Sequence, residues 1–446
     1  MTEPMASTTS IADRFRAQVS RRNINTEAII EAPLVHLDDD ELEEDVRQFA
    51  ENLPGVPFQR ILRAAQVSKE IRAYTDEGLQ DSLPIKLKPK ERIALKAERD
   101  KAFSQSGMTV IVVTVALAAL LQGHVQASIN AGSIYARLLQ EKVSSTTDRS
   151  DLVWQLGGMN SAPFLAAAIL GAPMSLPLNY WMGRRGAIAV AAALIFASSL
   201  ASGFVHTWQE LLGVRIVNGI GMGIKAVSTP ILASETAIDQ WRGSSILMWQ
   251  LYVPLDVKGD LTFRSILAAP MVPAVFTLIA LAYCMESPRF YMQKNTPNYR
   301  PMRAYEILSK VRNTQVDFHV MILPHSLRDI YLIHMNVEYE EAQNLPETPH
   351  ESGVSTENQK QGLTFANHMS FALSDAYRQY SHLLTTPRLR NAVWSTCIVA
   401  LAQQLCGINV FAFYSNNFFI KGDPSPRNAM LYSLGFNLLT SSGDGY

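Results

Sequence analysis

Long apolar runs alternate with strongly polar blocks along this chain. The apolar runs cover about residues 108–135, 152–180, 187–205, 211–232, 265–284 and 391–419. Because about 20 apolar residues cross a bilayer as a helix, each of these runs predicts a membrane-spanning helix. The run 391–419 contains no acidic or basic residue at all. The pattern predicts an all-α membrane protein.

The polar blocks divide the chain into four expected domains. They are a cytoplasmic tail with short amphipathic helices (1–106), a transmembrane bundle (107–289), a cytoplasmic helical or disordered loop domain (290–386) and a second transmembrane region (387–446). Basic residues between 86 and 101 precede the first apolar run, and such residues favour the cytoplasmic side of a membrane. The simplest interpretation of 1–106 is an ordinary solvated tail, with contact to anionic lipid as an addition.

Composition excludes several classes of function. The chain has 39 basic and 40 acidic residues, so nothing indicates affinity for nucleic acid. Its three cysteines lie in or beside apolar runs, and their spacing fits neither a disulfide framework nor a metal site. We find no nucleophile–base pair and no phosphate-binding loop, so we expect neither an enzyme nor a cofactor.

Polar side chains occur within the last apolar run, at membrane depth. Gln403, Gln404, Asn409 and Tyr414 all lie there, and Gln404 and Asn409 are five positions apart, which brings them near one another on a helix. A buried amide that bonds nothing costs about 2–7 kcal/mol. Two explanations remain open: the polar stripe faces a water-filled cavity for a polyhydroxylated ligand, or the amides join helices to one another.

The string QQ-x-x-G-x-N, followed by Phe413, Tyr414 and Ser415, resembles the seventh-helix motif of the sugar porter family of the major facilitator superfamily. The resemblance implies a monosaccharide or polyol site in which Gln403, Gln404 and Asn409 bond hydroxyl groups. It places Tyr414 near an extracellular gate. Further substrate contacts implied by the family are Gln250, from the fifth helix, and Gln126, from the first.

Other segments resemble the same family. They are the turn Gly183-Arg184-Arg185-Gly186, the glycine-rich string that begins at Arg215, the ending at Glu235 with Arg242-Gly243, and Glu286-Ser287-Pro288-Arg289. The resemblance implies a cytoplasmic charge cluster that closes an inner gate when the protein faces outward. Its expected members are Arg184, Arg185, Arg215, Glu235, Arg242, Glu286 and Arg289.

The first span departs from the proton-coupled relatives at one position. Many of them have an aspartate where this chain has Val125, and valine carries no proton. His124 beside it is the titratable alternative. We therefore expect a sugar or polyol and the lipid bilayer as partners, and we do not expect proton symport through Val125.

A complete member of the family has two six-helix bundles, whereas this chain supplies the first bundle, a seventh helix and part of an eighth. After Arg242-Gly243 the apolar run covers only Ile246–Leu255, about half of the ~20 residues that a span needs. We therefore expect a shortened fifth helix and a chain truncated after the start of the eighth. If 246–255 fails to cross, the block 290–386 faces outward; if it crosses, the block faces the cytoplasm.

The function we predict from the sequence is transport of a monosaccharide or polyol by alternating access, in a plasma-membrane protein with a cytoplasmic N-terminus. We expect the 446-residue chain to be inactive by itself. The alternative is a sugar sensor that has the same site and signals through its long cytoplasmic segments.

Overall fold

The computed structural model describes residues 34, 37–69, 74, 85–87, 106–130, 149–236, 267–294, 296, 298–312, 325–344, 380–381, 383–385 and 387–407. Every regular element among these residues is a helix, which agrees with the predicted all-α class. The chain forms two compact units. Unit 1 combines 1–108 with 287–396, and unit 2 combines 109–286 with 397–446.

Unit 1 is built from helices that lie far apart in the sequence. They are α2 (Asp39–Ala50), α3 (Phe58–Lys69), the 3-10 helix η2 (Pro288–Met292), α14 (Pro301–Val311) and α15 (His325–Asn344). α3 packs against α2 and α15, and α14 packs against α15 and η2. The sequence predicted short amphipathic helices in 1–106 and helical structure in 290–386, but it assigned these segments to two separate domains. The structure joins the N-terminal segment and the loop segment in one unit.

The sequence of α2 explains why this segment folds. Asp38 caps the helix, and the Glu41 side chain accepts a hydrogen bond from the Asp38 backbone N–H, at 3.2 Å, to complete a capping box. Leu42, Val46 and Phe49 then recur at helical spacing and are all buried in the core of the unit. The expectation that 1–106 is an ordinary solvated tail is therefore wrong for α2.

A polar group is buried beside this core. The Tyr331 hydroxyl on α15 donates a hydrogen bond of 2.8 Å to Asp45 Oδ2 on α2, and Phe49 stacks on His334 with ring centroids 4.4 Å apart. Burial, followed by the nearby Asp45 carboxylate, raises the pKa of Tyr331, so the hydroxyl keeps the proton that it donates. These contacts bind the N-terminal segment to the loop by packing and by a specific hydrogen bond.

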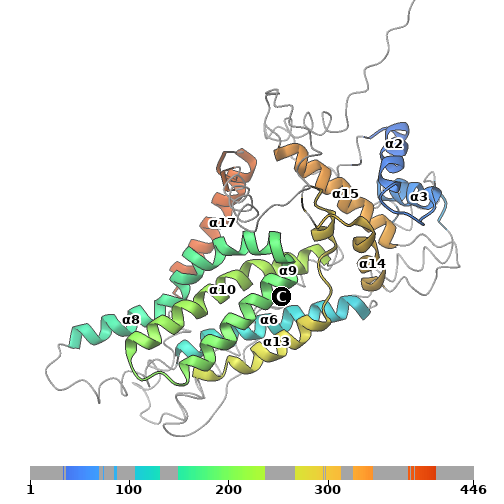
Figure 1. Ribbon diagram of the computed structural model, residues 1–446. Helices are drawn as coiled ribbons and strands as arrows, with labels where there is room; N and C mark the ends of the chain where they lie inside the picture. The colour runs from blue at the N-terminus through green and yellow to red at the C-terminus, as the bar shows by residue number, and fades with distance from the viewer. Residues whose placement is uncertain are drawn as a thin grey trace, which may run out of the picture. The chain divides into compact units, whose positions relative to one another are not determined.

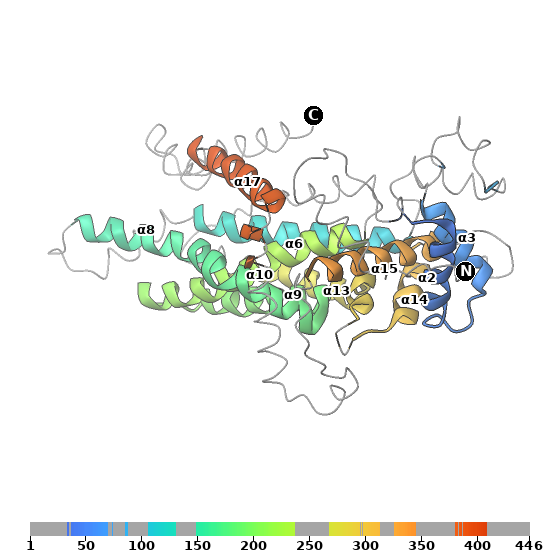
Figure 2. The same ribbon diagram turned by 90° about the horizontal axis from the view of Figure 1, so that it is seen from above.

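Unit 2 is a bundle of long apolar helices (Figures 1 and 2). Its elements are α6 (Ser106–Asn130), α8 (Arg149–Ala166), the π-helix η1 (Ala167–Gly171), α9 (Ala172–Ser202), α10 (Trp208–Thr236) and α13 (Met271–Tyr283). α10 packs against α8, η1 and α9, and α13 packs against α9. Among the described residues, Gly107–Val125, Gly157–Ser202 and Trp208–Thr236 are long and apolar enough to cross a membrane, and Met271–Tyr283 is a shorter apolar helix.

The continuous helical stretch Gly157–Ser202 contains the two spans that the sequence separates. Its backbone leaves the helical conformation at Gly183, where φ is 80° and ψ is 177°. This is the position of the predicted basic turn, so the stretch bends there and the two halves act as separate helices. The fifth helix expected near 246–255 lies outside the described residues. α17 (Pro387–Leu405) begins the expected seventh span.

Close contact between α10 and the α8–η1 segment depends on a glycine. A Cβ atom on Gly223 would lie 2.3 Å from the Ala167 carbonyl oxygen and 2.8 Å from the Ala172 nitrogen, both of which are backbone atoms. No side chain can move aside to relieve such a clash. Small residues at this crossing therefore let the two backbones touch, as in many membrane helix pairs.

We predict that Gly223→Ala lowers the thermal midpoint of unfolding of the detergent-solubilised chain. Overpacking typically costs about 1–3 kcal/mol, and here the helices themselves must separate. Gly213→Ala is the matched control on the same helix, since a Cβ there meets nothing within 4 Å. Helix propensity alone favours alanine over glycine by about 1 kcal/mol. Equal loss of stability in the two variants, followed by circular dichroism, would reject this packing argument.

Candidate functional site

The basic turn after the first half of α9 is held by a carboxylate. Glu286 Oε1 accepts hydrogen bonds from the backbone N–H groups of Arg184, at 2.9 Å, and of Arg185, at 3.1 Å. Gly183 makes this approach possible in two ways. It adopts a positive φ that favours glycine, and a Cβ atom on it would lie 2.3 Å from Glu286 Oε2.

The side chain of Arg184 turns toward the end of α10. Its Nε and Nη2 atoms donate to Glu235 Oε2 and Oε1, each at 2.8 Å, in a two-pronged ion pair whose side chains are both 10% exposed. Such geometry is the strongest that arginine and a carboxylate form. Removing one partner from a buried pair typically costs about 3–5 kcal/mol, because the other charge is left without compensation.

These contacts join one end of three helices. Arg184 belongs to α9, Glu235 to α10, and Glu286 follows α13, while Arg185 Nη2 donates to the Ala282 carbonyl of α13 at 3.3 Å. The structure thus brings together four of the seven residues expected in the charge cluster.

The other three expected members are Arg242, Arg289 and Arg215. Arg242 lies outside the described residues. Arg289 forms an ion pair with Glu340 of α15, within unit 1. Arg215 is a correction: it lies 20 positions before Glu235 on α10, or about 30 Å along the helix. Its Nη1 atom donates to the Met159 carbonyl and to Asn160 Oδ1 on α8, both at 2.8 Å.

A second cation is buried in the bundle. Lys225 on α10 is 1% exposed, and its Nζ atom donates to the Ala118 carbonyl of α6 at 2.6 Å. A helix carbonyl has a second lone pair after its own helical bond, so it can accept from a lysine. Arg215 and Lys225 therefore link α10 to α8 and α6 through carbonyl oxygens.

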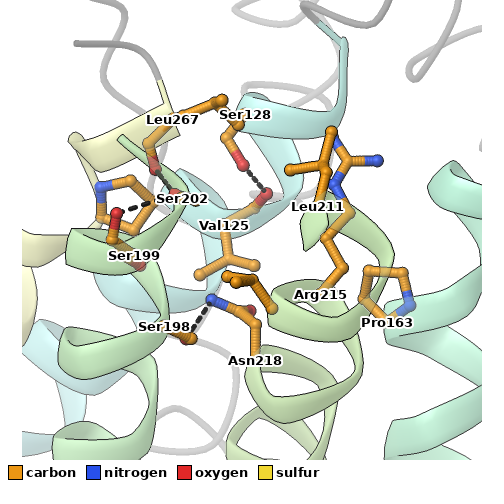
Figure 3. Close-up of a pocket in the computed structure, with 12 residues that line it drawn as sticks. Val125, Ser128, Pro163, Ser198, Ser199, Ser202, Leu211, Arg215, Asn218 and Leu267 are labelled. Carbon is orange, nitrogen blue, oxygen red and sulfur yellow. Dashed lines mark hydrogen bonds between the residues drawn. The ribbon is translucent and has the colours of Figure 1, made fainter. Parts of the chain in front are cut away.

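Between α6, α9 and α10 lies a small cavity with both polar and apolar lining (Figure 3). Its volume is about 20 Å³. The lining includes Val125, Ser128, Ser198, Ser199, Ser202, Arg215 and Asn218. Asn218 Nδ2 donates to Ser198 Oγ at 3.0 Å, and Ser202 Oγ donates to the Leu267 carbonyl at 3.0 Å. The cavity is far smaller than the roughly 300–1,000 Å³ of a ligand pocket, so it is not a sugar site.

The expected substrate residues contribute no described side chain. Gln126 lies in α6 and Gln403 and Gln404 lie in α17, but their side chains are outside the described part of the structure. The remaining three, Gln250, Asn409 and Tyr414, lie entirely outside it. All six stay predictions.

Sequence reasoning missed two polar residues that the bundle uses, Asn160 and Asn218. A signal for Asn218 was present in the sequence. One face of α10 is marked by residues at spacings of three and four, namely Leu211, Arg215, Asn218, Met222 and Lys225. Asn160 had no such signal, since its role depends on Arg215 from another helix.

Comparison with known proteins matches this bundle to membrane transporters. A family model described as "Sugar (and other) transporter" matches residues 111–322. The arabinose-proton symporter of Escherichia coli (strain K12) is 29% identical over 178 residues, which are 38% of this chain and 37% of that protein. The proton myo-inositol cotransporter of Homo sapiens is 26% identical over 277 residues, which are 59% of this chain and 36% of that protein.

Solved structures agree on the fold. The proton:xylose symporter XylE of the major facilitator superfamily, bound to 6-bromo-6-deoxy-D-glucose, matches with a TM-score of 0.50 and 20% identity over 74% of this chain and 66% of that chain. The chain spans between a third and a half of the length of the curated relatives just described. These relatives are membrane transporters, not enzymes, which confirms the prediction that the chain is not an enzyme.

Proposed function

We propose that the chain is a sugar porter of the major facilitator superfamily and that it serves the transport of a monosaccharide or polyol across a membrane. The observation that carries the proposal is the family match over 111–322, which covers α8 to α14 and most of α6. Transport by this fold needs no covalent chemistry. The protein exposes a binding site to one side of the membrane and then to the other.

The site that we propose for the substrate uses amide and hydroxyl side chains. Gln403, Gln404 and Asn409 donate to and accept from sugar hydroxyls, Gln250 and Gln126 add contacts from other helices, and Tyr414 lies near the outer gate. Amides suit such a ligand because each has both donors and an acceptor. The names of the relatives support this class, since they include arabinose and myo-inositol.

The charge cluster gives the first bundle a rigid end. The two-pronged Arg184–Glu235 pair and the Glu286 clamp on the Gly183 turn hold α9, α10 and the end of α13 in one arrangement. A bundle that moves as one body needs such fixed ends. We propose that this cluster biases the equilibrium between inward-facing and outward-facing states by stabilising one of them.

We predict that Gln404→Ala and Asn409→Ala each weaken sugar binding to the purified chain. Each variant leaves a substrate hydroxyl without its partner, which costs about 1–3 kcal/mol. Equilibrium dialysis with labelled hexoses, pentoses and inositols measures the dissociation constants. Thr396→Ala on α17 is the control, since this exposed hydroxyl bonds the Ala392 carbonyl of its own helix. Equal affinities in the wild type and both amide variants would reject the assignment.

Protons are a separate question, because two relatives are named as proton-coupled. We propose that this chain does not couple to protons through α6, where Val125 is buried among apolar side chains. We expect equal sugar affinity at about pH 6 and about pH 8 in the wild type, and unequal affinity in Val125→Asp, because a buried carboxylate takes up a proton readily. A pH-dependent affinity in the wild type that His124→Ala abolishes would contradict this, because it would place the titrating group on α6.

The shared core of unit 1 bears on topology. Phe49 of α2 and Tyr331 of α15 belong to one hydrophobic cluster, and residues of one core lie on one side of a membrane. This supports a topology in which the N-terminal segment and the loop face the same side. Basic residues before α6 favour the cytoplasm, and we propose the plasma membrane as the location.

We predict that Gln48→Cys and Glu306→Cys, both at exposed positions, react with a membrane-impermeant thiol reagent only after cells are permeabilised. His206→Cys, exposed between α9 and α10, is expected outside and reacts in intact cells. The background replaces Cys284, Cys397 and Cys406 by serine. Reaction at only one of positions 48 and 306 in intact cells would contradict the shared side.

A sugar sensor is the second candidate, and the folded unit 1 favours it, because a domain built from both soluble segments offers a surface for signalling. Sugar uptake without signalling would reject the sensor, and signalling without uptake would favour it.

The expectation that the 446 residues do not transport by themselves stays a prediction. Saturable uptake in cells that lack other hexose carriers would overturn it.

A further inference from the structure

The cavity between α6, α9 and α10 is lined by two residues with buried groups that the described part of the structure leaves without partners. The Ser199 hydroxyl and the Asn218 carbonyl oxygen have no hydrogen-bond partner there, and both residues line the cavity. Ser199 is 2% exposed and Asn218 is 8% exposed, so bulk water does not reach them. Buried polar groups are almost always bonded, and ordered water is a common partner where no protein group supplies one.

Size and chemistry restrict what that molecule can be. A volume of about 20 Å³ exceeds the roughly 10–15 Å³ that one water requires, and it excludes a sugar. Arg215 lines the same cavity, and its positive charge disfavours a metal cation. An anion is disfavoured by the partial negative charge of the Asn218 carbonyl oxygen. Ser199 offers a donor and Asn218 an acceptor, so the occupant has to both accept and donate.

We propose that this cavity binds one ordered water molecule, which accepts a hydrogen bond from Ser199 and donates one to Asn218. The water connects α9 to α10 at a point where these two side chains do not meet. It also lies beside Arg215, whose charge it helps to solvate within the bundle. Val125 is one of several apolar residues that line the site (Figure 3). The water completes a polar network that already includes Ser198 and Ser202.

Radiolytic hydroxyl-radical footprinting of the full chain in detergent tests this, because radiolysis of a bound water oxidises the side chains that touch it. Leu211 lines the cavity and is 3% exposed, whereas Leu232 on the same helix is 0% exposed and lies outside the cavity. The two leucines have the same intrinsic reactivity. We expect oxidation of Leu211 and none of Leu232. If neither leucine is oxidised, the cavity is dry; if both are oxidised equally, no site exists, and either result overturns the proposal.

Two variants locate the water. Ser199→Val replaces the hydroxyl by two methyl groups and so removes the donor, and Asn218→Leu removes the acceptor. Both variants are expected to abolish oxidation of Leu211. Leu232 reports on folding in the same sample, since an unfolded variant oxidises it as well. Persistent oxidation of Leu211 in folded Ser199→Val would mean that bulk solvent, not a bound water, reaches it, and would overturn the assignment.

Discussion

α10 buries two cations in an apolar bundle, and the need to bond them determines how its neighbours are placed. Arg215 reaches carbonyl and amide oxygens of α8, and Lys225 reaches a carbonyl of α6. A charge in this environment is costly unless it is bonded, so each contact restricts both the rotation of α10 and its distance from its neighbour. The glycine at 223 permits the close approach on one side. The two cations and the glycine of α10 thus together determine how α6, α8 and η1 pack against it.

At one end of the bundle, buried carboxylates instead of cations hold the helices together. Glu235 and Glu286 hold one turn, the first through the Arg184 side chain and the second through backbone N–H groups. Only a glycine at 183 allows the second contact, because its backbone conformation and the absence of a Cβ are both needed. In a protein that alternates between two states, an end tied in this way moves as one body. The proposed water between Ser199 and Asn218 extends such bonding toward the other end of α10.

Unit 1 is a folded part of the chain. The sequence suggested a solvated tail and a separate loop for the same segments. α2 and α15 are separated by nearly the whole first bundle in sequence, and yet Asp45 and Tyr331 form one buried hydrogen bond. Such a contact ties the N-terminal segment to the loop that follows the bundle. The N-terminal segment and the loop are therefore expected to move together, whether the protein transports a sugar or senses it.

The sequence by itself predicted the helical class and the membrane spans, and it indicated a resemblance to sugar porters. Apolar runs of sufficient length leave a helix as the structure that satisfies the backbone in a bilayer, and the polar blocks 1–106 and 290–386 were expected to contain short helices. It also identified the basic turn and its two carboxylates, because those residues belong to recognisable strings. Tertiary structure alone decided the partners. Arg215 was assigned to the wrong end of α10 because a charge in a motif does not reveal which helix it meets. The union of α2 with α15 was invisible for the same reason, since a shared core depends on contacts between residues almost 300 positions apart, and no local pattern records such contacts.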